Sequence, residues 1–274
     1  MKIILIQGGL GNQLYEYTYY RYLKEKSPKE KIWGFYLKKW LHDHNGLEIN
    51  RWFDVDLPPT NKFIYALSIV LYYTNSILNR LGVTPFFVNK KWEQDDDAFF
   101  QIGFWQDSKY IKEVGIPSLN TLELDQYNKD ILTKIESTSS VAIHVRRGDY
   151  LTPINIEMFG NICTTEYYKK SLEYIKNKFD NPTFFVFSND IEYAQELLAS
   201  ESNVVFVDKN KGAMSFFDMF LMSNCKGLIL ANSSFSAWGA YLNKRARCII
   251  APSKWVNKPP FPHVYADNWI KISV

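Results

Sequence analysis

The stretch VAIHVRRGDY, Val141 to Tyr150, joins a buried strand to a charged turn. Its apolar side chains alternate with a second set, which is the period of two expected of a strand. A glycine ends the strand, so His144 and Arg146 project together from its end, and Arg147 and Asp149 follow directly. An arginine at the edge of a core needs an anion, and its planar fork fits phosphate or carboxylate oxygens. The stretch therefore indicates either a nucleotide diphosphate site or an arginine paired with Asp149 for structure alone.

Strand-like and helix-like segments alternate through the rest of the second half. Strands are predicted at Val141–Val145, Phe184–Phe187, Val204–Val207, Leu228–Ala231 and Cys248–Ala251. Helices are predicted at Thr165–Lys178, Ile191–Ala199, Ser215–Cys225 and Phe235–Lys244. This alternation predicts an α/β fold with right-handed βαβ units and a parallel sheet. Ligands bind such sheets at the carboxyl ends of the strands, where the polar clusters Ser188–Asp190 and Asn232–Ser236 fall.

The first half is less regular. A strand at Lys2–Ile6, a glycine loop, a helix from Asn12 to Lys26 and a strand at Ile32–Leu37 are predicted, followed by a helix at Asp125–Glu136. Ser137–Ser140 reads as a linker, so we predict two domains, residues 1–137 and 138–274. The uncharged stretch Phe63–Asn79 contains several polar residues and is a poor membrane span. We expect it to form a buried helix; the alternative is an interfacial helix that approaches a lipid-linked substrate.

Composition excludes several classes of protein. A net charge of +3 argues against a dedicated nucleic-acid binder. The three cysteines are widely spaced and form no CxxC, so neither a disulfide framework nor a thiolate metal site is predicted, and a reducing cytoplasm is the expected setting. The first apolar run is too short for a signal peptide. The group His42–His44 and the triplet Asp95–Asp97 read as exposed surface, so no metal site is predicted.

Two turns lead into helices. QGGLGNQLYEY, Gln7 to Tyr17, brings backbone N–H groups to a helix start, either for a ligand or as a structural turn capped by Asn12. Leu14 stands where a redox dinucleotide fingerprint needs a third glycine, which disfavours a nicotinamide-dependent dehydrogenase. ILANSSFSAWGAYL, Ile229 to Leu242, offers phosphate donors at a helix start, namely Asn232, Ser233, Ser234 and Ser236. A simple cap would need only one serine.

Two acidic residues follow the same logic. Asp218 lies in the apolar helix SFFDMFLM, where a buried carboxylate needs donors. Guanine offers two adjacent donors; alternatively, Asp218 simply faces solvent. Asp190 ends the strand FSND and either contributes to the site or caps the next helix.

Taken together, the chain resembles the alpha-1,2-fucosyltransferases of bacteria and animals, glycosyltransferase family 11. The matching segments are GGLGNQLYEY at Gly8–Tyr17, GFWQDSKY at Gly103–Tyr110, HVRRGDY at His144–Tyr150, FVFSND at Phe185–Asp190 and DMFLMSNCKGLILANSSFSAWGAYLN at Asp218–Asn243. They occur in family order, and the HxRRxD element and the last run are the most specific. Residues 40 to 95 align with nothing in the family, and Ala237–Ala240 departs from the double tryptophan of many members.

The resemblance implies a GT-B architecture, in which two Rossmann-like domains face a cleft. The C-terminal domain would bind GDP-fucose and the N-terminal domain the acceptor. Arg146 would bind the diphosphate, His144 and Asp218 would contact guanine, and Ser233–Ser236 would close over the phosphates. The candidate donor-binding residues are His144, Arg146, Arg147, Ser188, Asp190, Asp218, Asn232, Ser233, Ser234, Phe235 and Ser236.

The same resemblance implies inverting, metal-independent transfer of L-fucose from GDP-fucose to galactose O2 of a glycan in surface polysaccharide synthesis. The candidate catalytic residues are Arg146, for the leaving group, Asp149, as base, and Asn12, to orient the acceptor. Asp149 could instead only position the arginines. No cofactor is expected, and the acceptor could be lipid-linked, with peripheral contact to the inner membrane. The alternatives are a different linkage, another nucleotide sugar, or a non-catalytic nucleotide- or glycan-binding protein.

Overall fold

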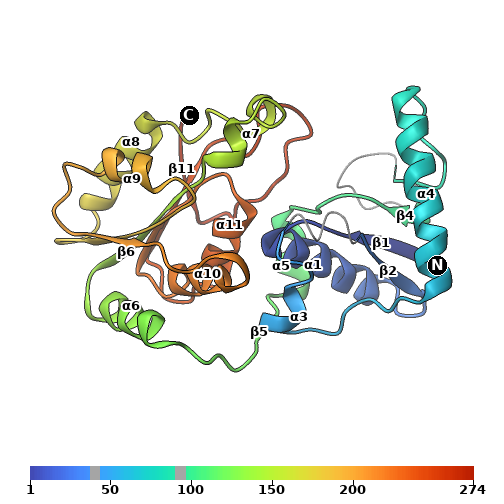
Figure 1. Ribbon diagram of the computed structural model, residues 1–274, viewed down its shortest axis with the longest axis horizontal. Coiled ribbons are helices and arrows are strands. Elements are labelled where there is room, and N and C mark those ends of the chain that lie inside the picture. The colour runs from blue at the N-terminus through green and yellow to red at the C-terminus, as the bar shows by residue number, and fades with distance from the viewer. Residues whose placement is uncertain (38–43, 90–96) are drawn as a thin grey trace. The chain divides into compact units, whose positions relative to one another are not determined.

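The computed structural model describes residues 1–37, 44–89 and 97–274. The chain divides into two compact units, Met1–Thr121 (unit 1) and Leu122–Val274 (unit 2). Each unit contains a parallel sheet with helices packed on it, which confirms the α/β prediction (Figure 1). The predicted surface residues His42, Asp43, Asp95 and Asp96 lie outside the described residues, whereas Asp97 is exposed as predicted.

Unit 1 is built on the three-stranded parallel sheet β2–β1–β4 and the short antiparallel pair β3–β5. Its strands are β1 (Lys2–Ile6), β2 (Ile32–Tyr36), β3 (Phe53–Asp54), β4 (Phe100–Gln101) and β5 (Ser118–Leu119). Its helices are α1 (Leu10–Lys26), α3 (Ile49–Trp52), α4 (Lys62–Arg80) and α5 (Ser108–Val114). Several of its aromatic side chains are core residues, since Tyr19 stacks on the buried Trp105 with 3.8 Å between ring centroids.

The glycine loop differs from the prediction at its cap. Helix α1 begins at Leu10 with Gly9 as its N-cap, so Asn12 lies inside the first turn and does not cap the helix. The Asn12 Oδ1 instead accepts a hydrogen bond from Gln106 Nε2 at 2.9 Å. The fully buried Gln13 holds the loop, because its Nε2 donates to the backbone oxygens of Gly8 at 2.8 Å and Gly46 at 2.9 Å.

The predicted helix at Phe63–Asn79 is confirmed as α4, but the expectation that it is buried is wrong. Only Ile64, Ser68 and Asn75 are buried, whereas Phe63 is 73% exposed. One side of the helix packs on β2, where Tyr65 contacts the Phe35 ring at 5.6 Å between centroids. No helix among the described residues is long and apolar enough to cross a bilayer.

Unit 2 contains a six-stranded sheet. Its strands are β6 (Ser140–Val145), β7 (Thr183–Ser188), β8 (Val204–Val207), β9 (Gly227–Ile229), β10 (Cys248–Pro252) and β11 (Ile270–Ile272). Its helices are α6 (Gln126–Ser137), α7 (Ile156–Phe159), α8 (Thr165–Lys176), α9 (Ile191–Leu197), α10 (Phe216–Met222) and α11 (Ser234–Tyr241), with 3₁₀ turns η1 (Gly148–Leu151) and η2 (Gly212–Met214). All five predicted strands are confirmed, and β11 is an addition.

The strand order of this sheet identifies where a ligand should bind. The order is β11-β10-β9-β6-β7-β8, and every neighbouring pair is parallel. The chain runs outward from β6 through β7 to β8, then returns to the other side of β6 and runs outward through β9, β10 and β11. The direction therefore reverses between β6 and β9, which is the topological switch point of a doubly wound sheet. A crevice is expected beyond the carboxyl ends of these two strands.

The boundary between the units lies between Thr121 and Leu122, earlier than the predicted boundary at residue 138. Helix α6 belongs to unit 2 because it packs on α10 and β6. The fully buried Asn128 and the largely buried Asn210 exchange two amide hydrogen bonds of 3.0 and 2.9 Å, which tie α6 to the loop before α10. The hydrophobic periodicity of α6 gave no indication of this polar attachment.

Candidate functional site

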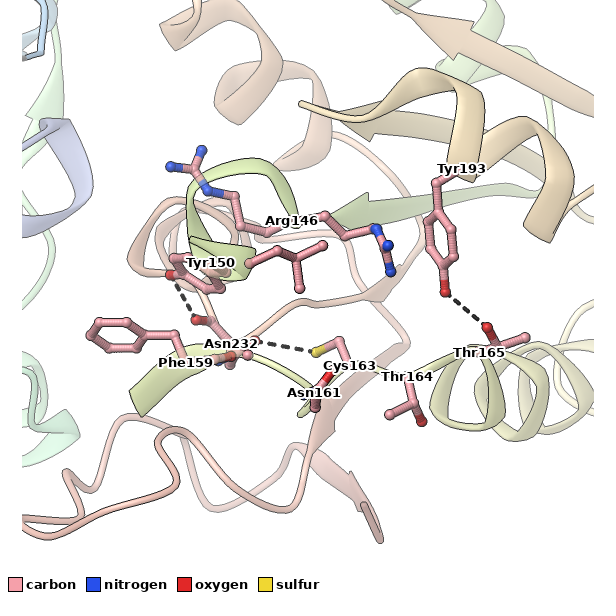
Figure 2. A pocket seen from close by; sticks show the side chains of 12 residues that line it. Arg146, Tyr150, Phe159, Asn161, Cys163, Thr164, Thr165, Tyr193 and Asn232 are labelled. Carbon is pink, nitrogen blue, oxygen red and sulfur yellow. Dashed lines mark hydrogen bonds between the residues drawn. The ribbon is translucent and has the colours of Figure 1, made fainter. Parts of the chain in front are cut away.

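A pocket of about 230 Å³ opens at the expected switch point of unit 2 (Figure 2). It lies beyond the ends of β6 and β9, and the first turns of α8 and α9 contribute to it. Its lining residues are Arg146, Arg147, Tyr150, Leu151, Phe159, Gly160, Asn161, Cys163, Thr164, Thr165, Tyr193 and Asn232. The lining combines two guanidinium groups with hydroxyl, amide and aromatic groups, a combination suited to a phosphorylated ligand.

Arg147 is held by the strand-end cluster of β7. Its Nε donates to the Asp190 carboxylate at 3.1 Å, and its guanidinium lies 3.8 Å from the centroid of the Tyr193 ring. Its backbone N–H donates to Asn189 Oδ1 at 3.0 Å. These contacts fix the turn after β6 against the turn after β7, so Arg147 shapes the pocket wall.

Arg146 makes fewer polar contacts within the protein than Arg147 does. Its Nη2 donates to the half-exposed Asp149 carboxylate at 3.0 Å, and its guanidinium lies 5.5 Å from the Tyr150 ring centroid. Its Nε is buried and has no hydrogen-bond partner among the described residues. A buried donor without an acceptor is costly, so this group is poised for an anion in the pocket. The predicted pairing with Asp149 is present, and it leaves donors of Arg146 unused.

Asn232 holds the pocket together from the end of β9. Its Nδ2 donates to the backbone oxygens of Phe159 and Trp255, both at 3.1 Å, while its Oδ1 accepts from Cys163 Sγ at 3.4 Å. Its backbone oxygen accepts from the Tyr150 hydroxyl at 3.1 Å. Figure 2 shows the bonds from Tyr150 and Cys163 converging on this residue. Asn232 is thus a structural clamp of the pocket wall as well as a lining residue.

His144 lies inside the sheet on β6, two residues before the pocket residue Arg146. It is 5% exposed, and burial, reinforced by the Arg146 charge, lowers its pKa to about 3. The imidazole is therefore neutral near pH 7. Its Nδ1 is buried without a hydrogen-bond partner among the described residues, and its ring lies 5.9 Å from that of Phe235. His144 and Phe235 do not line the pocket itself.

The serine-rich start of α11 splits into inward and outward members. Ser236 is fully buried, with its hydroxyl 3.2 Å from the Ala231 oxygen and 3.3 Å from the Ser233 oxygen. Ser233 is the N-cap residue, but its side chain makes no capping hydrogen bond to the helix. Ser234 and Phe235 are partly exposed. Because its hydroxyl points inward to these two backbone oxygens, Ser236 supports the start of the helix.

Asp218 does not simply face solvent, since its side chain is only partly exposed, and burial raises its pKa to about 7. Its Oδ1 accepts from Asn210 Nδ2 at 2.8 Å, and Asn210 is in turn paired with Asn128. Asp208 nearby adds a smaller upward contribution to the same pKa. The carboxyl on α10 thus sits at the end of a buried amide chain and has acceptor capacity left for a ligand.

The structure brings some predicted residues together and separates others. Arg146, Arg147 and Asn232 line one pocket, and Asp149 and Asp190 pair with its two arginines. Asp190 also caps α9, as its structural alternative predicted, and Ser188 Oγ accepts from the Asp190 N–H at 2.9 Å. Asp218 and Ser233–Ser236 lie in unit 2 outside the pocket lining. Asn12 lies in unit 1, and its predicted part in catalysis stays a prediction.

Sequence reasoning missed most of the segment between η1 and α8. Phe159, Asn161, Cys163 and Thr164 all line the pocket. Asn161 adopts a left-handed backbone conformation with φ of 56°, which no sequence pattern revealed. The available signal was length, because the connection from β6 to α8 is long for an α/β loop, and long loops at strand ends often carry binding residues. Residues 1–37, 44–89 and 97–274 contain no group of three His, Cys, Asp or Glu residues placed to hold a metal ion.

Three relatives are similar in sequence. An alpha-1,2-colitosyltransferase from Escherichia coli is 30% identical, with 99% of each chain covered. The O-antigen biosynthesis glycosyltransferase WbnK from Escherichia coli is 28% identical, with 97% of this chain and 99% of the relative covered. A galactoside alpha-(1,2)-fucosyltransferase 1 from Leontopithecus chrysomelas is 31% identical over 37% of this chain and 28% of its own length.

The fold is also found in solved structures. The fucosyltransferase NodZ from Bradyrhizobium superposes with a TM-score of 0.54 at 13% identity, covering 90% of this chain and 94% of that one. This likeness confirms a fold of GT-B type. Residues 89–273 match the family described as Glycosyl transferase family 11, which is more than half of the chain. The chain therefore belongs to glycosyl transferase family 11, and the protein is a glycosyltransferase.

Proposed function

We propose that the protein transfers L-fucose from GDP-fucose to galactose O2 of a glycan, with inversion at the fucose anomeric carbon. The observation that carries the proposal is Arg146, which lines a pocket at the switch point of unit 2 and whose buried Nε lacks a partner among the described residues. The names of the relatives support the α1,2 linkage, and one relative named for O-antigen biosynthesis supports a role in surface polysaccharide synthesis.

In this reaction the acceptor hydroxyl oxygen forms a bond to the anomeric carbon while the bond from that carbon to the β-phosphate oxygen breaks. Negative charge develops on the departing GDP, and we assign its stabilisation to Arg146, with no metal ion required. The hydroxyl proton passes to a base, for which we propose Asp149, a half-exposed carboxylate 3.0 Å from Arg146. The ion pair with Arg146 holds that carboxylate in one orientation.

The guanine base is proposed to bind His144 and Asp218. The neutral imidazole of His144 can offer one donor and one acceptor, and its buried Nδ1 lacks a partner among the described residues. The Asp218 carboxylate, with its raised pKa, can accept from both guanine N1–H and N2–H₂. Two such donors would stabilise its ionised form and release a proton on binding near pH 7.

A second donor deserves testing because a relative similar over its full length is named a colitosyltransferase. Colitose is fucose without the hydroxyl at carbon 3, so the two GDP-sugars differ by one hydrogen-bonding group. A site that pairs with this hydroxyl rejects the analogue that lacks it, whereas an apolar site accepts both.

The experiment is acceptor-dependent GDP release with GDP-fucose, GDP-colitose and GDP-mannose, with a panel of galactosides, in EDTA. Product linkage is read by NMR. GDP-fucose turnover giving an α1,2 fucoside supports the proposal. Preference for GDP-colitose would retain the reaction and replace the donor. Turnover only with added divalent metal would overturn metal independence, and GDP binding without transfer to any acceptor would favour a binding protein.

A further inference from the structure

Helix α4 of unit 1 carries an exposed apolar stripe. We define the stripe as Phe63, Val70, Tyr73, Ile77 and Leu81, whose exposed fractions are 73%, 61%, 55%, 59% and 72%. Their spacings of three, four and seven residues place them along one face of the helix. Figure 1 shows the C-terminal half of α4, in cyan, projecting beyond the strands of its sheet. Large apolar groups that gather on one exposed face usually mark an interaction site.

The stripe does not serve the core of its own unit. The buried face of α4 is formed by other residues, including Ile64, Ser68 and Tyr72, the last of which contacts the Phe35 ring at 6.2 Å between centroids. The segment after the helix carries two further exposed apolar side chains, Val83, which is 50% exposed, and Phe86, which is 91% exposed. The helix is therefore anchored by one face and offers the other.

Charge along α4 has a single sign. No acidic residue occurs between Asp56 and Glu93 in the sequence. The exposed Lys62 and Arg80 stand at the two ends of the helix, and no charged residue separates them. An apolar face with cationic ends is complementary to a surface that is apolar inside and anionic outside.

We propose that the α4 stripe binds the surface of an anionic bilayer, with the helix lying in the plane of the interface. The apolar side chains enter the boundary between headgroups and acyl chains, and Lys62 and Arg80 contact anionic headgroups. Tyr73 suits this boundary because its ring is apolar and its hydroxyl can stay in water. The helix is too polar to span, as its serine, threonine and asparagine residues show.

A second copy of the chain fits the same surface poorly. An antiparallel pairing of two α4 helices would place Lys62 beside Arg80 of the copy, and a parallel pairing would place like residues together. Both pairings bring cations together with no acidic residue on the helix to offset them. The lipid surface supplies the missing negative charge.

The test is co-sedimentation of the full chain with phosphatidylcholine vesicles, with and without about one third phosphatidylglycerol. We expect binding to the anionic vesicles that weakens with salt. The double variant Val70→Asp/Ile77→Asp should lose at least about tenfold in partitioning. Lys62→Gln/Arg80→Gln should lose about fivefold for each charge on anionic vesicles only. The matched control is Phe261→Asp, whose side chain is also 61% exposed, as Val70 is, and it should bind like the wild type.

Each outcome decides the matter. Wild-type protein that stays in the supernatant with anionic vesicles overturns the proposal, as does Val70→Asp/Ile77→Asp binding at the wild-type level. A concentration-dependent dimer that the same double variant abolishes, with no vesicle binding, would assign the face to a second copy. Unchanged circular dichroism and Tm confirm that the variants fold. GDP-sugar turnover with a soluble acceptor should be unaffected, so failure here is separable from failure of the proposed reaction.

Discussion

Replacement of Asn232 by alanine should destabilise the pocket wall of unit 2. The side chain is 2% exposed and bridges three segments, through the oxygens of Phe159 and Trp255 and the thiol of Cys163. The Trp255 oxygen is buried, so leaving it without a donor costs about 1–3 kcal/mol, whereas the partly buried Phe159 oxygen costs about 0.5–1.5 kcal/mol because water can replace the donor. The thiol bond adds little. Together these terms give a loss of about 1.5–4.5 kcal/mol.

Urea unfolding followed by circular dichroism measures this loss, and thermal unfolding of a cooperative unit of this size should show a Tm lowered by roughly 3–18 °C. A second readout is local. Burial raises the pKa of Cys163 to about 12, so its thiol should react slowly with a disulfide reagent at pH 8. In Asn232→Ala this reaction should accelerate at least about tenfold as the wall opens. The KM for the donor should rise as well.

The matched control is Asn155→Ala, which removes one exposed hydrogen bond of 3.0 Å to the Asp149 oxygen near the same wall. It should cost less than about 1 kcal/mol and leave Cys163 slow to react. Equal stability of the two variants, together with unchanged Cys163 reactivity in Asn232→Ala, would refute the clamp assigned to Asn232.

Three further predictions concern neighbouring groups. Burial raises the folded-state pKa of Asp218 to about 7, above its unfolded value near 4, so the stability that Asp218 contributes is complete below about pH 4 and is lost as the pH rises to 7. Asp218→Asn should remove this pH dependence of the unfolding free energy, measured by urea titration at pH 5 and 8, and should be more stable than the wild type at pH 8 by up to about 4 kcal/mol. Gly148→Ala should cost about 1–2 kcal/mol in the urea midpoint, since its φ is +22° and the new Cβ would lie 2.5 Å from Asn189 Nδ2; a neutral result would contradict the strain. Arg147→Ala should lower stability by about 1–2 kcal/mol through loss of Asp190 and ring contacts, with Arg147→Lys recovering only part; full recovery by lysine would show that planar stacking is unimportant.

Much of unit 2 was predictable from sequence because local and global signals agree there. The strand at Val141–Val145 is apolar except for His144, as suits a central parallel strand, and β6 is buried along its whole length. Strand–helix alternation then fixes the carboxyl ends of the strands as the site edge. For this reason the sequence alone points to Arg146, Arg147 and Asn232, all of which line the pocket.

The failures arise where tertiary contacts override local pattern. Asparagine is a residue type favoured at helix N-caps, which is why Asn12 was predicted to be the cap. The structure instead has Gln13 holding the glycine loop through hydrogen bonds to Gly8 and to the distant Gly46, and the helix begins earlier, at Leu10. The stretch Phe63–Asn79 is apolar enough for a core helix, yet only one of its faces packs on the sheet of unit 1. The unit boundary was misplaced because the Asn128–Asn210 amide pair that attaches α6 is invisible to hydrophobic periodicity.

Turnover of Arg146→Ala with GDP-fucose and a galactoside acceptor, measured beside its Tm, tests the central claim most directly. Arg146 has an exposed ion pair and a buried Nε without a partner among the described residues, so its removal should leave the Tm within about 2 °C. The loss of leaving-group stabilisation should lower kcat by about 10²–10³-fold. A well-folded Arg146→Ala enzyme with turnover within a few fold of the wild type would contradict the assignment of this pocket to the donor diphosphate.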